Sequence, residues 1–164
     1  MNRDKRWKPS VTVAAVIERD GRFLLVEEET PEGLRLNNPA GHLECGESPQ
    51  QGAVREALEE TARTFVPDRF LGLYLSRFQR PGAGEDVTYL RLAYGGTAGE
   101  CDASRTLDVG IVRTVWMTLD EVRASRDQHR SGLVLRCIED FAAGRRFPLD
   151  AVFADPSLFD PEVK

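Results

Sequence analysis

The sequence predicts an α+β domain in which a mixed β-sheet is flanked by helices. Its 164 residues fit one domain better than two, and a chain of this size buries roughly 70% of its unfolded surface. Short apolar segments bounded by turn residues are mixed with segments that carry helix start signals. Tight hairpins among them argue against a purely parallel sheet. We therefore expect residues 1–164 to form a single domain.

The first expected strand covers residues 11–18, an apolar and β-branched segment that is typical of a strand buried on both faces. Asp20-Gly21 follows it and favours a two-residue hairpin turn, because this dipeptide tolerates positive φ. A Pro-Gly-Ala-Gly loop at residues 81–84 separates two later strands. The other strands are expected at residues 23–26, 34–37, 70–78, 87–94 and 111–116.

Three helices are predicted from their start and stop signals. Ser48 can cap a helix whose first residue is Pro49, and Gln51 completes a capping box, so this helix should continue to about Arg63. A second capping box opens a short helix at residues 118–121. The third helix is expected at residues 133–143, an amphipathic segment followed by Gly144.

Composition restricts the classes of function. The net charge of −5 argues against a general nucleic-acid binder, whose surface would be basic. No apolar run reaches the ~20 residues that span a bilayer, and the charged first residues lack the apolar region of a secretory signal. Three scattered cysteines fit neither a disulfide framework nor a CxxC metal site. We therefore expect a cytoplasmic protein with no membrane partner and no long nucleic-acid partner.

The helix that starts at Ser48 carries three carboxylates on one face. On a helical wheel Glu59 lies about 60° to one side of Glu56 and Glu60 about 40° to the other, while the apolar residues lie opposite. A solvated acidic face is the alternative interpretation, because such faces are common. Clustered carboxylates also suit hard cations such as Mg²⁺, which take oxygen ligands. The loop before the helix would place phosphate at the helix N-terminus.

The same residues resemble the signature of the Nudix hydrolase family, G-x5-E-x7-R-E-U-x-E-E-x-G-U, where U is a bulky aliphatic residue. Six fixed positions match at the required spacing: Gly41, Glu47, Arg55, Glu56, Glu59 and Glu60. Ala62 stands where the family has glycine and Arg63 where it has an aliphatic residue. A left-handed residue after the helix costs alanine roughly 1–2 kcal/mol. We therefore expect the helix to end differently, with Phe65 supplying an apolar contact.

The resemblance covers about residues 11–150, and the segments that flank the signature are similar to those of the NudJ phosphatase subfamily. It implies the Nudix fold, an α/β/α sandwich. It also implies that Glu56 and Glu60 bind Mg²⁺, or Mn²⁺ in its place, and that Glu59 is a further ligand or a base acting through water. The backbone carbonyl of Ala40 would complete the metal site.

Supporting roles are implied for Glu47 and Arg55, which would hold the loop against the helix and orient Glu56. Many relatives place another acid on a distant loop, and both Asp108 and Glu85 are candidates here. The sequence alone does not choose between these two residues.

The resemblance implies a Mg²⁺-dependent hydrolase in which water attacks a pyrophosphate linkage of a small phosphorylated compound. Expected substrates are nucleoside di- and triphosphates, thiamine pyrophosphate and its pyrimidine-pyrophosphate precursor. The alternatives are ADP-ribose, oxidised nucleotides or RNA 5′ ends as substrates, and a catalytically silent binding module. Monomer and homodimer are both compatible with the sequence.

Four residues are candidates for substrate contact. Gly41 belongs to the signature, while Tyr74, Tyr89 and Arg91 lie on the two strands expected beside the carboxylate helix. Alternation along a half-buried strand explains the last three equally well. Both interpretations remain open from the sequence.

Overall fold

The computed structural model describes residues 6–160 and contains one mixed seven-stranded sheet. The strand order is β3-β2-β1-β6-β5, with β4 paired to β1 and β7 paired to β2. β1 and β6 are parallel, and the other pairs are antiparallel. The strands are β1 Ser10–Arg19, β2 Arg22–Thr30, β3 Gly33–Asn37, β4 Ala40–His42, β5 Phe65–Arg80, β6 Glu85–Ala98 and β7 Ile111–Thr118.

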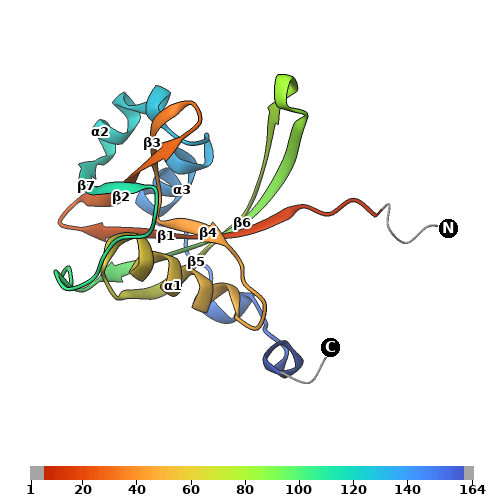
Figure 1. Ribbon diagram of the computed structural model, residues 1–164. Helices are drawn as coiled ribbons and strands as arrows, with labels where there is room; N and C mark the ends of the chain where they lie inside the picture. The colour runs from red at the N-terminus through yellow and green to blue at the C-terminus, as the bar shows by residue number, and fades with distance from the viewer. Residues whose placement is uncertain (1–5, 161–164) are drawn as a thin grey trace.

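The helices form two layers, one on each face of the sheet (Figure 1). α1 (Pro49–Thr61) covers one face, and its Ala53 and Ala57 pack with alternate residues of β1 such as Val13. α2 (Leu119–Ala124) and α3 (Leu133–Ala142) cover the other face, where Ile138 packs with Ala14. β1 is buried on both faces, as expected. The prediction of an α+β domain with helices on both faces of a mixed sheet is confirmed.

The hairpin between β1 and β2 has the predicted turn. Asp20 and Gly21 have φ values of 51° and 75°, which are the two positive values of a type I′ turn. The Gly21 N–H also donates to the Glu18 carboxylate at 2.6 Å. A local dipeptide signal is therefore sufficient to set the pairing of these two strands.

β5 is longer than the sequence indicated. It begins at Phe65 rather than at residue 70, because β-bulges between Pro67 and Arg69 and between Phe70 and Gly72 absorb residues that normally mark turns. β5 and β6 form a long hairpin that projects from the body of the molecule (Figure 1). β4 was expected as loop, but it pairs with β1 and so fixes the segment that precedes α1.

The expectation that α1 ends unlike its relatives is wrong. Ala62 adopts the left-handed conformation, with φ 55° and ψ 30°, and its N–H donates to the Leu58 carbonyl at 2.9 Å. The Ala62 side chain is buried, which offsets part of the cost of about 1–2 kcal/mol for this conformation. Phe65 lies in the same apolar cluster as Ala57, so the expected contact is present.

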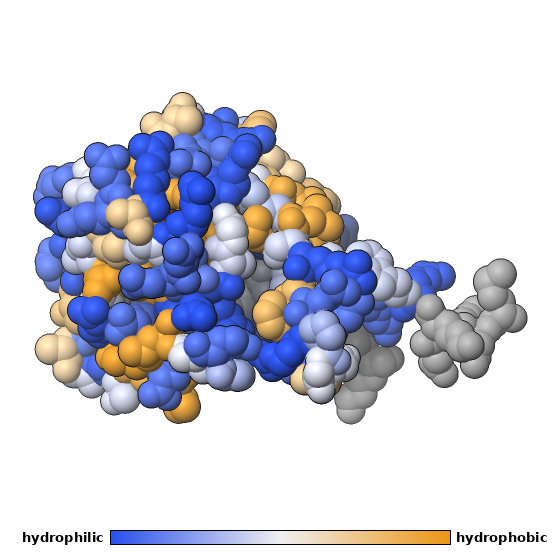
Figure 2. Space-filling view, turned by 90° about the horizontal axis from the view of Figure 1, so that it is seen from above, coloured by the Kyte–Doolittle hydropathy of each residue, from blue (hydrophilic) through white to orange (hydrophobic). Residues whose placement is uncertain are grey.

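The surface seen from above is mainly hydrophilic, and its apolar residues form separate patches (Figure 2). Among residues 6–160, no helix has the length and apolar character needed to cross a membrane.

Candidate functional site

The carboxylate helix begins at the predicted cap. The Ser48 side chain accepts from the Gln51 N–H at 3.2 Å, and the Gln51 side chain accepts from the Ser48 N–H at 2.8 Å. This reciprocal pair fixes the helix start and therefore the direction of every side chain after it. Glu56 and Glu60 are 7% and 6% exposed, whereas the Glu59 side chain is 41% exposed. The three carboxylates share one side of the helix but differ strongly in solvation.

Gly41 gives β4 its close approach to α1. A Cβ at this position would lie 2.2 Å from the Glu56 Oε1 atom, so any side chain here would displace the Glu56 carboxylate. The requirement for glycine here therefore comes from the neighbouring carboxylate. A direct contact with substrate is a separate prediction for Gly41.

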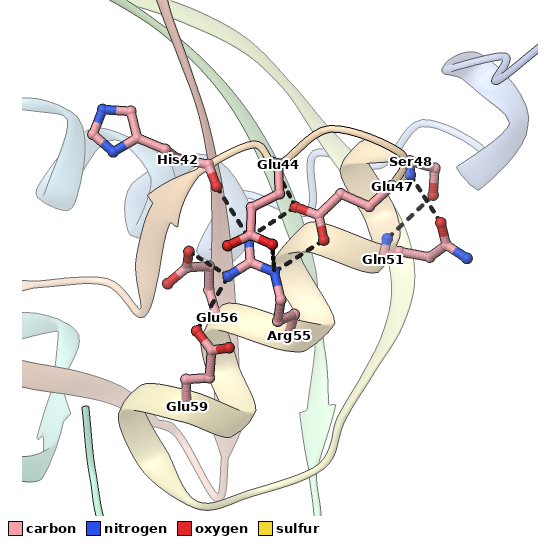
Figure 3. Close-up of polar contacts among 8 residues, drawn as sticks. All are labelled: His42, Glu44, Glu47, Ser48, Gln51, Arg55, Glu56 and Glu59. Carbon is pink, nitrogen blue, oxygen red and sulfur yellow. Dashed lines mark hydrogen bonds and ion pairs between the residues drawn. The ribbon is translucent and has the colours of Figure 1, made fainter. Parts of the chain in front are cut away.

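Arg55 is the centre of the polar network that joins the loop to the helix (Figure 3). Its Nε and Nη2 atoms donate to the two oxygens of Glu47 at 2.9 and 2.8 Å. Nη2 also donates to the His42 carbonyl at 3.0 Å. Nη1 donates to Glu56 at 2.8 Å and to Glu59 at 3.1 Å. These contacts connect the loop before α1 to the middle of the helix.

The pKa values of Glu47 and Glu56 are shifted in opposite directions. The hydrogen bonds from Arg55 lower the pKa of Glu47 below its usual value. Burial raises the pKa of Glu56, because it outweighs the hydrogen bond and charge of Arg55. Hydrogen bonding to Glu47 in turn raises the pKa of Arg55, which stays protonated.

Glu60 has the most perturbed carboxyl group of the site. Burial raises its pKa to about 8, and the charges of Glu56, Glu28 and Asp108 act in the same direction. Its Oε2 atom accepts from the Ala40 N–H at 2.9 Å, and no arginine or lysine of the described residues forms an ion pair with it. The Ala40 carbonyl was expected to complete the metal site, whereas the contact that the structure shows is a hydrogen bond from the Ala40 N–H to Glu60.

The two candidates for a distant acid lie in different places. The Asp108 N–H donates to the Glu59 carbonyl at 2.9 Å, and the Asp108 charge raises the pKa of Glu56 and Glu60. Glu85 instead pairs with Arg80 at 2.9 Å at the tip of the β5–β6 hairpin. The structure thus brings Asp108, and not Glu85, to the carboxylate helix.

Glu28 on β2 is an additional acid that the sequence reasoning missed. Burial raises its pKa, and its charge contributes to the raised pKa of Glu60. It accepts from the Asn37 Nδ2 at 3.3 Å and pairs with Arg130 at 3.6 Å. Glu28 is the middle of three consecutive glutamates on β2. Its side chain is no more buried than that of Glu27, which pairs with Arg113, so the run of glutamates does not by itself single out Glu28.

The three strand residues that were predicted to contact substrate differ in their exposure and in the face of the sheet on which they lie. Tyr74 is buried on the face opposite α1, and its hydroxyl donates to Asp140 at 2.8 Å. Arg91 is 7% exposed and donates to Asn38 at 3.1 Å and to Asn37 at 3.3 Å. The Tyr89 ring is more accessible and lies 6.5 Å from the His42 ring, centre to centre.

The donor set fits a hard divalent cation. Among residues 6–160, no three His, Cys, Asp or Glu side chains are already gathered as a ligand sphere. Glu56 and Glu59 contact the Arg55 guanidinium, whereas Glu60 is buried next to further acids and has no cationic partner in the described part of the chain. Carboxylate oxygens are the ligands that Mg²⁺ and Mn²⁺ prefer, and a bound cation would supply the charge that Glu60 lacks.

The fold and this constellation define a hydrolase of the Nudix class. Residues 6–137 match the family model described as the NUDIX domain, so the chain belongs to the Nudix family. Members of this family hydrolyse phosphate and pyrophosphate linkages and generally use divalent metals.

Individual relatives support this assignment. The chain is 32% identical to "Phosphatase NudJ" of Escherichia coli (strain K12) over 146 residues, which cover 89% of this chain and 92% of NudJ. A solved NUDIX hydrolase from Nitrosomonas europaea is 49% identical with a TM-score of 0.81, covering 90% of this chain and 98% of its own. The NUDIX domain of Shewanella oneidensis NrtR, solved with ADP ribose, has a TM-score of 0.66 at 18% identity, covering 88% and 93%, and shares the fold.

Proposed function

We propose that this protein is a Mg²⁺-dependent hydrolase of pyrophosphate linkages in small phosphorylated compounds. The proposed substrates are nucleoside di- and triphosphates, thiamine pyrophosphate or its pyrimidine-pyrophosphate precursor. The observation that carries the proposal is the burial of Glu60 beside other acids, with no cationic side chain from residues 6–160 paired to it. Such a cluster is costly in the absence of a bound metal and becomes favourable when a divalent cation lies among the carboxylates.

The three carboxylates of α1 would have different roles in the reaction. Glu56 and Glu60 would hold Mg²⁺, and Glu59, which is the most exposed of the three, would complete the site or accept a proton from water. Bound Mg²⁺ would neutralise phosphate oxygens and lower the pKa of the attacking water. Asp108 and Glu28, whose charges raise the pKa of Glu60, would add to the same site.

Arg55 and Glu47 would position the metal-binding side chains. Their two hydrogen bonds tie the loop before α1 to the middle of the helix, and the Arg55 Nη1 atom holds Glu56 at 2.8 Å. Phosphoryl transfer depends mainly on positioning and electrostatic stabilisation, so this rigidity contributes directly to the rate. Of the predicted strand residues, Tyr89 is the least buried and would contact the organic part of the substrate.

The choice of substrate follows from similarity and charge. The 32% identity to a phosphatase over most of both chains favours release of orthophosphate from small compounds. ADP-ribose remains the alternative, because the NrtR domain of the same fold was solved with it. The net charge of −5 disfavours a long RNA partner.

A release assay tests the proposal. The full chain is incubated with thiamine pyrophosphate, nucleoside di- and triphosphates and ADP-ribose, with Mg²⁺ or with a chelator, and phosphate and pyrophosphate are measured separately. We expect Mg²⁺-dependent release from at least one of the first two classes. Release from none of these compounds would contradict the proposal and favour a silent binding module, and release from ADP-ribose alone would favour that substrate.

Glu56→Gln separates catalysis from folding. We expect it to remove nearly all turnover while the Tm changes little, and Glu29→Gln, an exposed glutamate on β2, serves as the matched control. Near wild-type rates for Glu56→Gln at saturating Mg²⁺ would show that this carboxylate does not hold the metal.

A further inference from the structure

A hollow of about 400 Å³ lies between the first turn of α1 and the segment that follows α3. Its walls come from the start of α1, from β6 and from two short 3-10 turns, η4 (Leu149–Ala151) and η5 (Pro156–Phe159). None of the residues that contact Arg55 lines it. The volume is within the range of small-molecule sites, which is roughly 300–1,000 Å³. The hollow is therefore separate from the carboxylate network.

Tyr94 contributes an unpartnered polar group to the lining of this hollow. Its side chain is 1% exposed and packs against Phe70, with ring centres 5.2 Å apart. Among the described residues its hydroxyl has no hydrogen-bond partner. The hydroxyl oxygen is not completely sealed from solvent. Tyr94 lines the hollow, and an unpartnered hydroxyl that is not sealed from solvent can be reached by a ligand there. Buried tyrosine hydroxyls normally have a partner, so a ligand is the missing one.

The protein groups around the hollow favour a cation over an anion. In the first turn of α1, Ser48 already accepts the N–H groups of Gln51 and Gly52, and Pro49 has none to offer. The free N–H groups that bind phosphate at other helix starts are therefore mostly occupied. Asp150 contributes a carboxylate, and the lining contains no lysine, arginine or histidine. A full negative charge in contact outweighs the helix dipole, whose effect is about 0.3–1 kcal/mol.

The remaining lining is apolar. Leu149, Val152 and Phe159 contribute side chains that can cover a hydrocarbon body, and the Phe159 ring can also lie against a cation. Burial raises the pKa of Tyr94 to about 12, so at neutral pH its hydroxyl keeps its proton while its oxygen still accepts a hydrogen bond.

We propose that this hollow binds a small organic ammonium ion. Its nitrogen donates to the Asp150 carboxylate and to the Tyr94 oxygen, and its apolar body packs against Leu149, Val152 and Phe159. This site is independent of the proposed hydrolysis, because it uses no residue of the carboxylate network.

The test uses phenethylamine as the probe and ¹⁵N-labelled full chain at pH 7, observed by amide NMR. We expect saturable shifts at Gln50, Gln51 and Leu149 with a millimolar Kd. Phenylacetate has the same ring with a carboxylate and should bind at least about tenfold more weakly. Equal binding of both compounds, or shifts confined to the residues around Glu60, would overturn the proposal.

Variants assign the contacts. Tyr94→Phe and Asp150→Asn should each weaken phenethylamine binding roughly three- to tenfold, the range expected for one hydrogen bond. Tyr74→Phe changes a buried tyrosine on the opposite face and should leave the affinity unchanged. Wild-type affinity in both hollow variants would contradict the assignment. Asp150 is exposed, so its variant remains informative even where Tyr94→Phe reduces folding.

Discussion

Replacing Glu60 by glutamine should stabilise the protein while it abolishes turnover. Burial raises the pKa of the Glu60 carboxyl from 4.5 to about 8. A carboxyl whose pKa is raised by folding destabilises the folded state, and this cost begins above the unfolded pKa of 4.5 and grows until about pH 8. Between these two values it amounts to about 1 kcal/mol at pH 5 and about 3 kcal/mol at pH 7.

Glutamine removes the charge but keeps an oxygen that can accept from the Ala40 N–H. Its new amide N–H groups lack a partner, which costs about 1 kcal/mol. The net gain in the free energy of unfolding should therefore be about 2 kcal/mol at pH 7 and close to zero at pH 5. For a domain of this size, 2 kcal/mol corresponds to a rise in Tm of about 6 °C.

The assay is thermal and urea unfolding of Glu60→Gln and wild type at pH 5, 7 and 8, in the presence of a chelator. Glu85→Gln is the control, because Glu85 forms only a partly exposed pair with Arg80 and should change stability by less than about 1 kcal/mol. A destabilised Glu60→Gln variant at pH 7, or a gain that is the same at pH 5 and pH 8, would refute the reasoning. Added Mg²⁺ should stabilise wild type and leave the variant unchanged, because the variant lacks the ligand.

Two further predictions concern the surroundings of the carboxylates. Gly41→Ala should lower turnover by at least about tenfold with little loss of secondary structure, because the new Cβ displaces the Glu56 carboxylate. Gly99→Ala is the matched control, since nothing lies within 4 Å of its Cβ position. Steady-state rates and circular dichroism are measured for both variants. Asp108→Asn should raise the Mg²⁺ concentration needed for half-maximal activity, whereas Glu85→Gln should not, because only Asp108 contacts the carboxylate helix. Identical Mg²⁺ titrations for these last two variants would remove Asp108 from the site.

The sequence was sufficient for the elements whose signals are local. Asp20-Gly21 predicted the hairpin turn and Ser48 with Gln51 predicted the start of α1, because each signal acts within four residues. It was insufficient for β5, where Pro67 and Gly72 resemble turn residues but are absorbed by bulges in a long pairing with β6. Pairing across the sheet outweighs local preference there.

The spacing of Glu56, Glu59 and Glu60 in the sequence determined that three carboxylates would share one side of a helix, since helical geometry depends only on residue number. Only the tertiary structure decided that Glu56 and Glu60 are buried while Glu59 is not, and that Asp108 rather than Glu85 lies beside them. Solvation and the approach of distant charges depend on which segments pack together, and long-range pairing sets this packing. The chemical groups of the site were therefore readable from the chain, whereas their proton affinities came from the fold.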